Sequence, residues 1–331
     1  MAMGKASDFQ VYHEQFYGGL YEKLAQNVDI FNAASRNAIR LVTEDMIGDY
    51  NKESFFDRVS NLVSRRDTTS VSAAADQKMT QGELVGVKIN RKIGPVAQTL
   101  DAWEKIGLTG PVAMKEMSFQ LGKQIGEEMA HDMVETSIRC AESALSGEAA
   151  NTYDATGQST TTMTITHLFN GLKKFGDMAS KIIIWIMHSK QYFDLNIQAA
   201  ADKIYEEAGV VVYGGAPGTA GRPVIVTDAD ALNIGANSNT NTYQCLGLVE
   251  NGVVVTDSES KRLVDEIVTG LENLSFRVQG EYAYNINLKG FAWDSTNGGA
   301  NPNDAALRLA SNWDKQYSSA KNLLGIRIVT T

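Results

Sequence analysis

The chain has 331 residues, 43% hydrophobic and 21% charged, which is typical of globular protein with one large or two ordinary domains. Its net charge of −9 argues against a surface that neutralises many phosphates, because nucleic-acid-gripping proteins are usually basic. Cys140 and Cys245 belong to no C-x-x-C pair, so we expect neither a zinc site nor a disulfide framework. No signal peptide and no membrane span are predicted, so we expect a chain made in the cytoplasm with no membrane partner.

Residues 1–65 are predicted to form helical pieces without a core of their own. Apolar residues from Phe16 to Leu24 follow a helical stripe, and a second helix is predicted from Asp29 through Leu41. Such pieces need another surface to pack on, so we expect an extended arm.

Residues 67–100 have β composition. Val85, Val87 and Ile89 alternate with small or polar residues, and a polar, Ala-rich tip lies around 73–82. This pattern predicts a long two-stranded excursion. An isolated hairpin is marginally stable in water, so it needs a surface from its own chain or from a neighbour.

A very long helix is predicted from Pro111 to about Ser146, because proline favours the first helical turn and Gly147 can end the helix. Its length is about 54 Å at a rise of 1.5 Å per residue. Its apolar residues recur every three to four positions and include Met114, Met117, Leu121, Ile125, Met129 and Met133.

An α/β lobe is predicted to follow, centred on the apolar strand Ile182–Met187. A threonine of the segment 164–166 is expected to cap the helix that precedes it. Asn251-Gly252 between apolar runs predicts a hairpin. The other predicted elements are a helix at 192–207, strands at 210–213, 223–227, 274–279, 281–289 and 323–329, and a short helix at 303–311.

The segment 223–230, PVIVTDAD, is the strongest indication of an enzyme. It resembles the signature of Mg²⁺-dependent haloacid-dehalogenase phosphotransferases, with Asp228 and Asp230 as the carboxylate pair. Leu232 departs from that signature and no acidic motif follows downstream, so a strand-end turn is the preferred interpretation.

Three other patterns lack the partners that their chemistry needs. The glycine-rich loop 214–221 has no P-loop lysine, and Glu128 with His131 is a single Glu-x-x-His copy where a di-iron bundle needs two. His188 lies at a strand end without a nucleophile or an acid. We therefore expect no enzyme, no catalytic residue, no metal site and no cofactor.

Two charged clusters suggest a contact between subunits. Scattered surface charge is the alternative; the functional hypothesis is that one subunit's hairpin lies on its neighbour's long helix with opposite charges facing each other. The basic cluster is Lys88, Arg91 and Lys92, and the acidic cluster is Glu127, Glu128, Asp132 and Glu135.

The order of segments resembles the tailed-bacteriophage major capsid protein with the HK97-type fold. The resembling residues are 175–189 with the exit Met187-His188-Ser189, then 221–228 and 246–255, and finally the closing positions 291–294, 301–302, 313 and 321–328. The resemblance covers nearly the whole chain.

That resemblance implies an α+β, HK97-like fold with five parts. These are an N-terminal arm (1–65), an E-loop (66–100), a peripheral domain with its spine helix (101–168), an apical domain (169–272) and return strands that complete the peripheral domain (273–331). It also implies self-assembly, through hexamers and pentamers, into an icosahedral shell around double-stranded DNA that is confined without sequence-specific binding. The implied location is the virion capsid, assembled in the host bacterial cytoplasm, with scaffolding, portal and decoration proteins as further partners.

Two rival functions stay open from the sequence. One is an encapsulin-like nanocompartment shell, which shares the fold. The other is a Mg²⁺-dependent phosphotransferase that uses Asp228 and Asp230.

Overall fold

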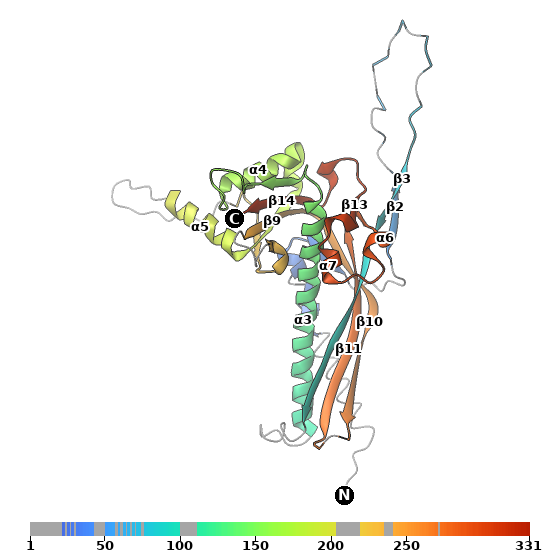
Figure 1. The fold of residues 1–331 in the computed structure, drawn as a ribbon, viewed down its shortest axis with the longest axis vertical. Coiled ribbons are helices and arrows are strands. Elements are labelled where there is room, and N and C mark those ends of the chain that lie inside the picture. Colours follow the sequence, from blue (N-terminus) through green and yellow to red (C-terminus); the bar gives the residue numbers. More distant parts are fainter. Residues whose placement is uncertain are drawn as a thin grey trace, which may run out of the picture.

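The computed structural model describes residues 22–23, 25–26, 28–29, 31–42, 50–56, 59, 62–63, 65–66, 68–69, 71–73, 76–99, 111–202, 219–234, 241–270 and 272–331. Figure 1 shows an elongated body in which one long helix runs beside long strands, with a lobe of shorter elements at one end. The predicted helical stripe before Leu24, the predicted strand 210–213 and most of the glycine-rich loop lie outside the described residues.

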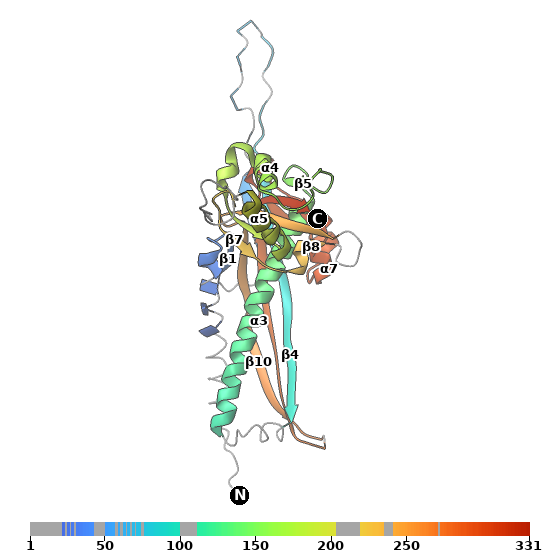
Figure 2. The same cartoon turned by 90° about the vertical axis from the view of Figure 1, so that its left-hand side faces the viewer.

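The long part of the body is a four-stranded sheet beside a single helix. The strand order is β1 (Ile39–Val42), β10 (Val253–Val268), β11 (Ser275–Leu288) and β4 (Val87–Thr99), with β1 parallel to β10 and the other pairs antiparallel. Helix α3 (Pro111–Ser146) has the predicted bounds and lies along this sheet (Figure 2). Met129 and Met133 of α3 share one buried core with Ile89 and Ile286 of the sheet, so the apolar stripe of the helix faces the strands.

The lobe contains a six-stranded sheet in which five strands run in the order β5 (Thr152–Asp154), β14 (Gly325–Thr330), β9 (Thr242–Val249), β6 (Ile182–Met187) and β7 (Val224–Val226), while β8 (Asn233–Ile234) pairs with β9. Strand β6 matches the predicted bounds and is almost entirely buried, as a strand covered on both faces should be. Helix α4 (Ile165–Phe175) is capped by Thr164, whose side chain accepts from the His167 N–H, which confirms the predicted cap. Helix α5 (Ser189–Asp202) follows β6 directly.

Short elements complete the fold near the end of the chain. The two tryptophans of the pair β12 (Phe291–Trp293) and β13 (Trp313–Lys315) pack edge to face, with ring centroids 4.9 Å apart. The remaining helices are α6 (Ser295–Gly298), α7 (Asp304–Leu307) and the 3-10 turns η1 (Gly176–Lys181), η2 (Asp230–Leu232), η3 (Ala310–Asn312) and η4 (Ala320–Asn322).

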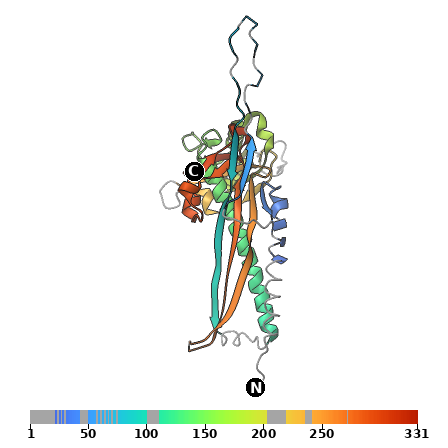
Figure 3. The same ribbon diagram turned by 90° about the vertical axis from the view of Figure 1, so that its right-hand side faces the viewer.

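The predicted excursion exists, but its strands differ from the prediction. Strand β2 (Lys52–Phe56) pairs antiparallel with β3 (Gln81–Val85), so the first strand lies before residue 57 and outside the predicted range 67–100. Figure 3 shows this hairpin projecting beyond the body, at the end away from the long sheet's free tip. Gly86 separates β3 from β4, and a Cβ there would lie 1.8 Å from Oδ1 of Asn287. The alternation read across 85–89 therefore spans two strands, and Val87 and Ile89 belong to the core of the body.

Two other predictions of local structure are corrected. The helix predicted through Leu41 ends earlier, because Arg36 and Asn37 take positive φ values of 51° and 58° and β1 begins at Ile39. The Asn251-Gly252 turn does not make a hairpin: β9 lies in the six-stranded sheet and β10 in the long sheet. The turn instead leads from one sheet into the other. The N–H groups of Asn251 and Val253 donate to backbone carbonyls of the two residues before β1.

The predicted closing strand is present as β14, which lies between β5 and β9 in the six-stranded sheet. β10 pairs with β11 in the long sheet. Among the helices that the structure describes, none is both long enough and apolar enough to cross a bilayer.

Candidate functional site: the charged network between the spine helix and the long sheet

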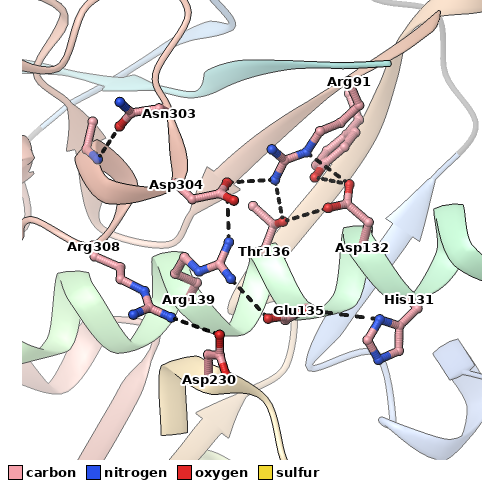
Figure 4. A network of polar contacts seen from close by, with 12 residues as sticks. Arg91, His131, Asp132, Glu135, Thr136, Arg139, Asp230, Asn303, Asp304 and Arg308 are labelled. Carbon is pink, nitrogen blue, oxygen red and sulfur yellow. Dashed lines mark hydrogen bonds and ion pairs between the residues drawn. The ribbon is translucent and has the colours of Figure 1, made fainter. Parts of the chain in front are cut away.

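Four polar residues of α3 lie on one face of the helix because they are three or four positions apart. This face meets β4, β11 and the start of α7, which come from three other parts of the chain (Figure 4). The helix residues are Asp132, Glu135, Thr136 and Arg139, and their partners are Arg91, Tyr282, Tyr284 and Asp304.

Asp132 is the centre of the network. Its Oδ2 accepts from Arg91 Nε at 3.1 Å and from the hydroxyls of Tyr282 and Tyr284, each at 2.8 Å. The two tyrosines are two positions apart on β11, so they lie on the same face of the strand. Burial, helped by the charge of Asp132, raises the pKa of both phenols well above the usual value, so both remain neutral donors.

Arg91 joins the helix to α7. Its Nη2 donates to Thr136 Oγ1 at 3.1 Å and to Asp304 Oδ1 at 2.9 Å. Asp304 also lies 3.3 Å from Arg139 Nη1, and Arg139 Nη2 donates to Glu135 at 3.0 Å. Charges of opposite sign therefore alternate through the network, so each buried charge is stabilised by a partner.

This arrangement is suited to holding elements together. Its carboxylates are engaged by guanidinium groups or hydroxyls, and its tyrosines cannot ionise near neutral pH. Within the described part of the chain, no group of three or more His, Cys, Asp or Glu residues could hold a metal ion.

The structure pairs several residues of the predicted charged clusters inside one chain. Arg91 binds Asp132 of the same subunit, because β4 packs on its own α3. Glu135 pairs with Arg139, and Glu127 lies 3.1 Å from Lys23. Arg91 and Asp132 therefore each have a partner within the same chain, and their part in a contact between subunits stays a prediction.

The other residues of the clusters lie differently. Lys88 is buried, with 8% of its surface exposed, whereas Lys92 on β4 and Glu128 on α3 are exposed. The structure does not bring these three residues into the network. Their part in a contact between subunits stays a prediction.

Sequence reasoning missed five members of the network: Thr136, Arg139, Tyr282, Tyr284 and Asp304. The spacing of Tyr282 and Tyr284 on an alternating strand was an available signal for two hydroxyls on one face. Arg139, one helical turn after Glu135, was a second signal. Asp304 gave no signal, because its position depends on how the loop after β12 folds back onto α3.

A second buried ion pair ties α3 to the six-stranded sheet. Arg327 Nε on β14 lies 2.9 Å from Glu142 Oε1, and both side chains are largely buried. Burial raises the pKa of Glu142 and lowers the pKa of Arg327, although each partner's charge acts in the opposite direction. Desolvation therefore outweighs the attraction between the two groups.

The residues that suggested enzymes have structural roles here. Asp228 Oδ1 accepts from the Ser189 N–H at 3.2 Å, at the start of α5. Hydrogen bonding from the Ser189 side chain, and secondly from this N–H, lowers the pKa of Asp228. The same carboxylate lies 3.4 Å from His188 Nε2, and Asp230 lies 3.8 Å from Arg308. The two aspartates thus have different partners, as the preferred interpretation of a strand-end turn expects.

The remaining candidate residues are His131 and the two cysteines, and each stands apart from the others. His131 is 72% exposed and lies 3.9 Å from Glu135. Both cysteines are buried free thiols, and burial raises the pKa of Cys140 to about 12, so neither is an accessible nucleophile.

Comparison with known proteins defines the class of this chain. Residues 8–327 match the Gp13-like family, described as major capsid protein 13-like. The chain therefore belongs to the family of the major capsid protein 13-like proteins, and it is a shell protein of a tailed-phage capsid. The predicted α+β, HK97-like fold class and the predicted role as a capsid shell protein are thereby confirmed, and the family is one of structural proteins.

Solved structures similar to this chain include three from bacteriophages. The capsid of Ralstonia phage GP4 has 13% identity and a TM-score of 0.48, over 90% of this chain and 88% of that one. The acid-stable capsid of Helicobacter pylori bacteriophage KHP30 has 10% identity and a TM-score of 0.47, with the same coverage. Microbacterium phage Oxtober96 has 9% identity and a TM-score of 0.49, over 89% of this chain and 90% of that one. No curated protein matches the chain significantly.

Proposed function

We propose that copies of this chain close into an icosahedral shell of hexamers and pentamers in which the β2–β3 hairpin of each copy lies on a neighbouring copy. The observation that carries this proposal is the apolar surface of the hairpin and its tip. The exposed fractions are 70% for Phe56 and for Leu62, 94% for Val63, 103% for Val71 and 64% for Met79.

Such exposure is unfavourable in a free subunit. A two-stranded hairpin is marginally stable alone, and large apolar side chains in one segment mark an interaction site. Covering them by a neighbour would offset the entropy lost when the segment is ordered. The same contact repeated by symmetry would give a closed shell with many modest contacts per copy.

We also propose a division of the chain into the parts that the capsid family implies. The peripheral domain would contain α3 and the long sheet, now including β10, and the apical domain would contain β6, α4 and α5. The E-loop would be the β2–β3 hairpin, bounded by Gly86, since β4 is a strand of the body.

Lys92 and Glu128 are the charged residues that best fit a contact between copies. Both are exposed, they have opposite charge, and they lie on β4 and α3 respectively. Lys88, Glu127 and Glu135 belong to the same proposed contact region, but burial or partners within the chain reduce what each can offer a neighbour.

The net charge of −9 supports a shell that confines double-stranded DNA without gripping it. Assembly would take place in the host bacterial cytoplasm, with scaffolding, portal and decoration proteins as further partners. Membership of a capsid family favours this function over an encapsulin-like compartment.

The test is to express the chain and examine it by size-exclusion chromatography and negative-stain electron microscopy. Closed particles or rings of subunits support the proposal. A small species with a phosphatase activity that Asp228→Asn abolishes would overturn it. Enzyme cargo in place of DNA, within particles from infected cells, would favour the compartment.

A further inference from the structure

One cavity of about 400 Å³ lies where the root of the β2–β3 hairpin meets the body. Phe55 and Phe56 of β2 line it on one side, and the segment from Tyr317 to Leu323 lines it on another. The Phe55 and Tyr317 rings meet edge to face with centroids 5.0 Å apart. A second cavity of about 220 Å³ shares the wall formed by Tyr317 and Lys289.

The polar lining of the larger cavity is cationic. Lys181, Lys289 and Lys321 all line it, and none of the described acidic residues does. Three positive charges around one cavity are unusual in a chain with nine more acidic than basic charges. This excess of positive charge identifies the ligand class as an anion.

Among the described residues, two of these three ammonium groups have no acidic partner. Lys321 lies 2.5 Å from Asp177, but no carboxylate among the described residues lies within ion-pair distance of Lys181 or Lys289. Lys289 Nζ donates to the Glu250 carbonyl at 3.3 Å. Partial burial lowers the pKa of Lys289 and the nearby charge of Lys181 lowers it further, whereas the charge of Glu250 raises it. An anionic group placed between Lys181 and Lys289 would relieve this repulsion.

The aromatic lining narrows the class of ligand. Phe56 is 70% exposed at the edge of the cavity, so an occupant would meet an apolar surface as well as the ammonium groups. An acidic side chain next to an apolar one satisfies both features. A second copy of this chain is the occupant that the charges favour, because its net charge is −9 and shell assembly brings copies together.

We propose that this cavity is a socket for an acidic segment of a neighbouring copy, whose carboxylate binds Lys181 and Lys289. The contact would fix the root of the hairpin on the body while the tip reaches another subunit. This inference rests on the proposed function, since it requires copies to meet in a shell.

Zero-length carbodiimide cross-linking tests the proposal, because it joins an amine only to a carboxylate in contact with it. Shells are assembled from a mixture of ¹⁴N- and ¹⁵N-labelled subunits, treated, digested and examined by mass spectrometry. Peptides that join Lys181 or Lys289 to an acidic residue with mixed isotopes are expected, since only links between copies mix the labels. Links confined to one isotope, no links in assembled shells, or nucleic acid coupled to these lysines would overturn the proposal.

Charge reversal gives an independent readout. The double variant Lys181→Glu/Lys289→Glu should keep the wild-type circular dichroism spectrum and lower the yield of shells at least tenfold. The control is Lys173→Glu/Lys174→Glu on α4, which changes two exposed lysines that do not line the cavity and should assemble normally. Shells of the first variant at wild-type yield and thermal stability would contradict the socket. Absence of shells from the wild-type chain would instead count against the proposed function.

Discussion

At the scale of single residues, Asp132 contributes most to the joint between the spine helix and the long sheet. One carboxylate oxygen accepts from a guanidinium and from two buried phenols. A buried donor that loses its acceptor incurs its full desolvation cost, so this side chain stabilises three partners at once.

Asp132→Asn should lower the free energy of unfolding of dispersed subunits by about 2–4 kcal/mol, because it removes the charge facing Arg91 and leaves the phenols a weaker acceptor. Urea denaturation followed by circular dichroism would measure the loss. Glu128→Gln, an exposed change on the same helix, is the control and should stay within about 0.5 kcal/mol of wild type. Equal stability of both variants would show that the network is not holding the helix.

The buried pair Glu142–Arg327 gives a prediction about pH. Because burial raises the pKa of Glu142 above its ordinary 4.5, the folded state binds this proton more tightly than the unfolded state. The corresponding stability is fully present below the ordinary pKa and is lost as the pH rises through the raised value. Lowering the pH from 7 towards 4.5 should therefore stabilise wild type relative to Glu142→Gln, as measured by unfolding of both proteins across that range. The opposite trend would mean that attraction to Arg327 outweighs desolvation.

At the scale of elements, the main difference between the predicted and the observed fold is the place of β4. Its residues looked like the second half of an excursion, but the strand pairs with β11 and packs on α3. The strands of the projecting hairpin are therefore shorter than predicted, and its first strand begins earlier in the chain.

Ile89→Ala tests this assignment. Ile89 is fully buried, so its truncation should cost about 2–5 kcal/mol in unfolding free energy. Val264→Ala on β10 of the same sheet is the matched control, because Val264 is 65% exposed, and it should cost less than about 0.5 kcal/mol. A negligible cost at Ile89 would place β4 outside the core.

Elements with long, regular patterns could be predicted from the sequence, and their pairings could not. The spine helix and β6 have the predicted bounds because a sustained 3.6-residue period and an unbroken apolar run are local signals. The Asn251-Gly252 turn illustrates this limit. The turn itself is a local signal, but the partners of the strand that follows it are distant in the sequence. Val253 of β10 pairs with Ile39 of β1 and with Leu288 of β11. The network at Asp132 was missed for the same reason, since Tyr284 and Asp304 reach it through tertiary packing.

At the scale of the whole molecule, the subunit consists of a long spine with its sheet, a compact lobe and a projecting hairpin (Figure 3). Buried apolar residues connect the spine with the lobe in one cluster that runs from Met129 to Leu248. The hairpin contributes exposed apolar side chains instead, as a segment that completes its burial on another copy would.

Replacing residues 59–78 by a short Gly-Ser turn should leave a soluble subunit with the wild-type circular dichroism spectrum, because β2 and β3 are kept. Shell formation should be lost, as judged by sedimentation velocity. A full-length variant with Leu62, Val63 and Val71 changed to serine keeps the chain length and should lower shell stability in the same direction. Normal assembly of both variants would refute the role given to the hairpin.

The most direct test of the central claim is electron cryo-microscopy of the wild-type shell. We expect the segment from Leu62 to Met79 of each copy to lie against the body of a neighbouring copy, with Val63 and Val71 buried in that contact. A shell in which this segment folds back on its own subunit, or remains exposed to solvent, would contradict the account.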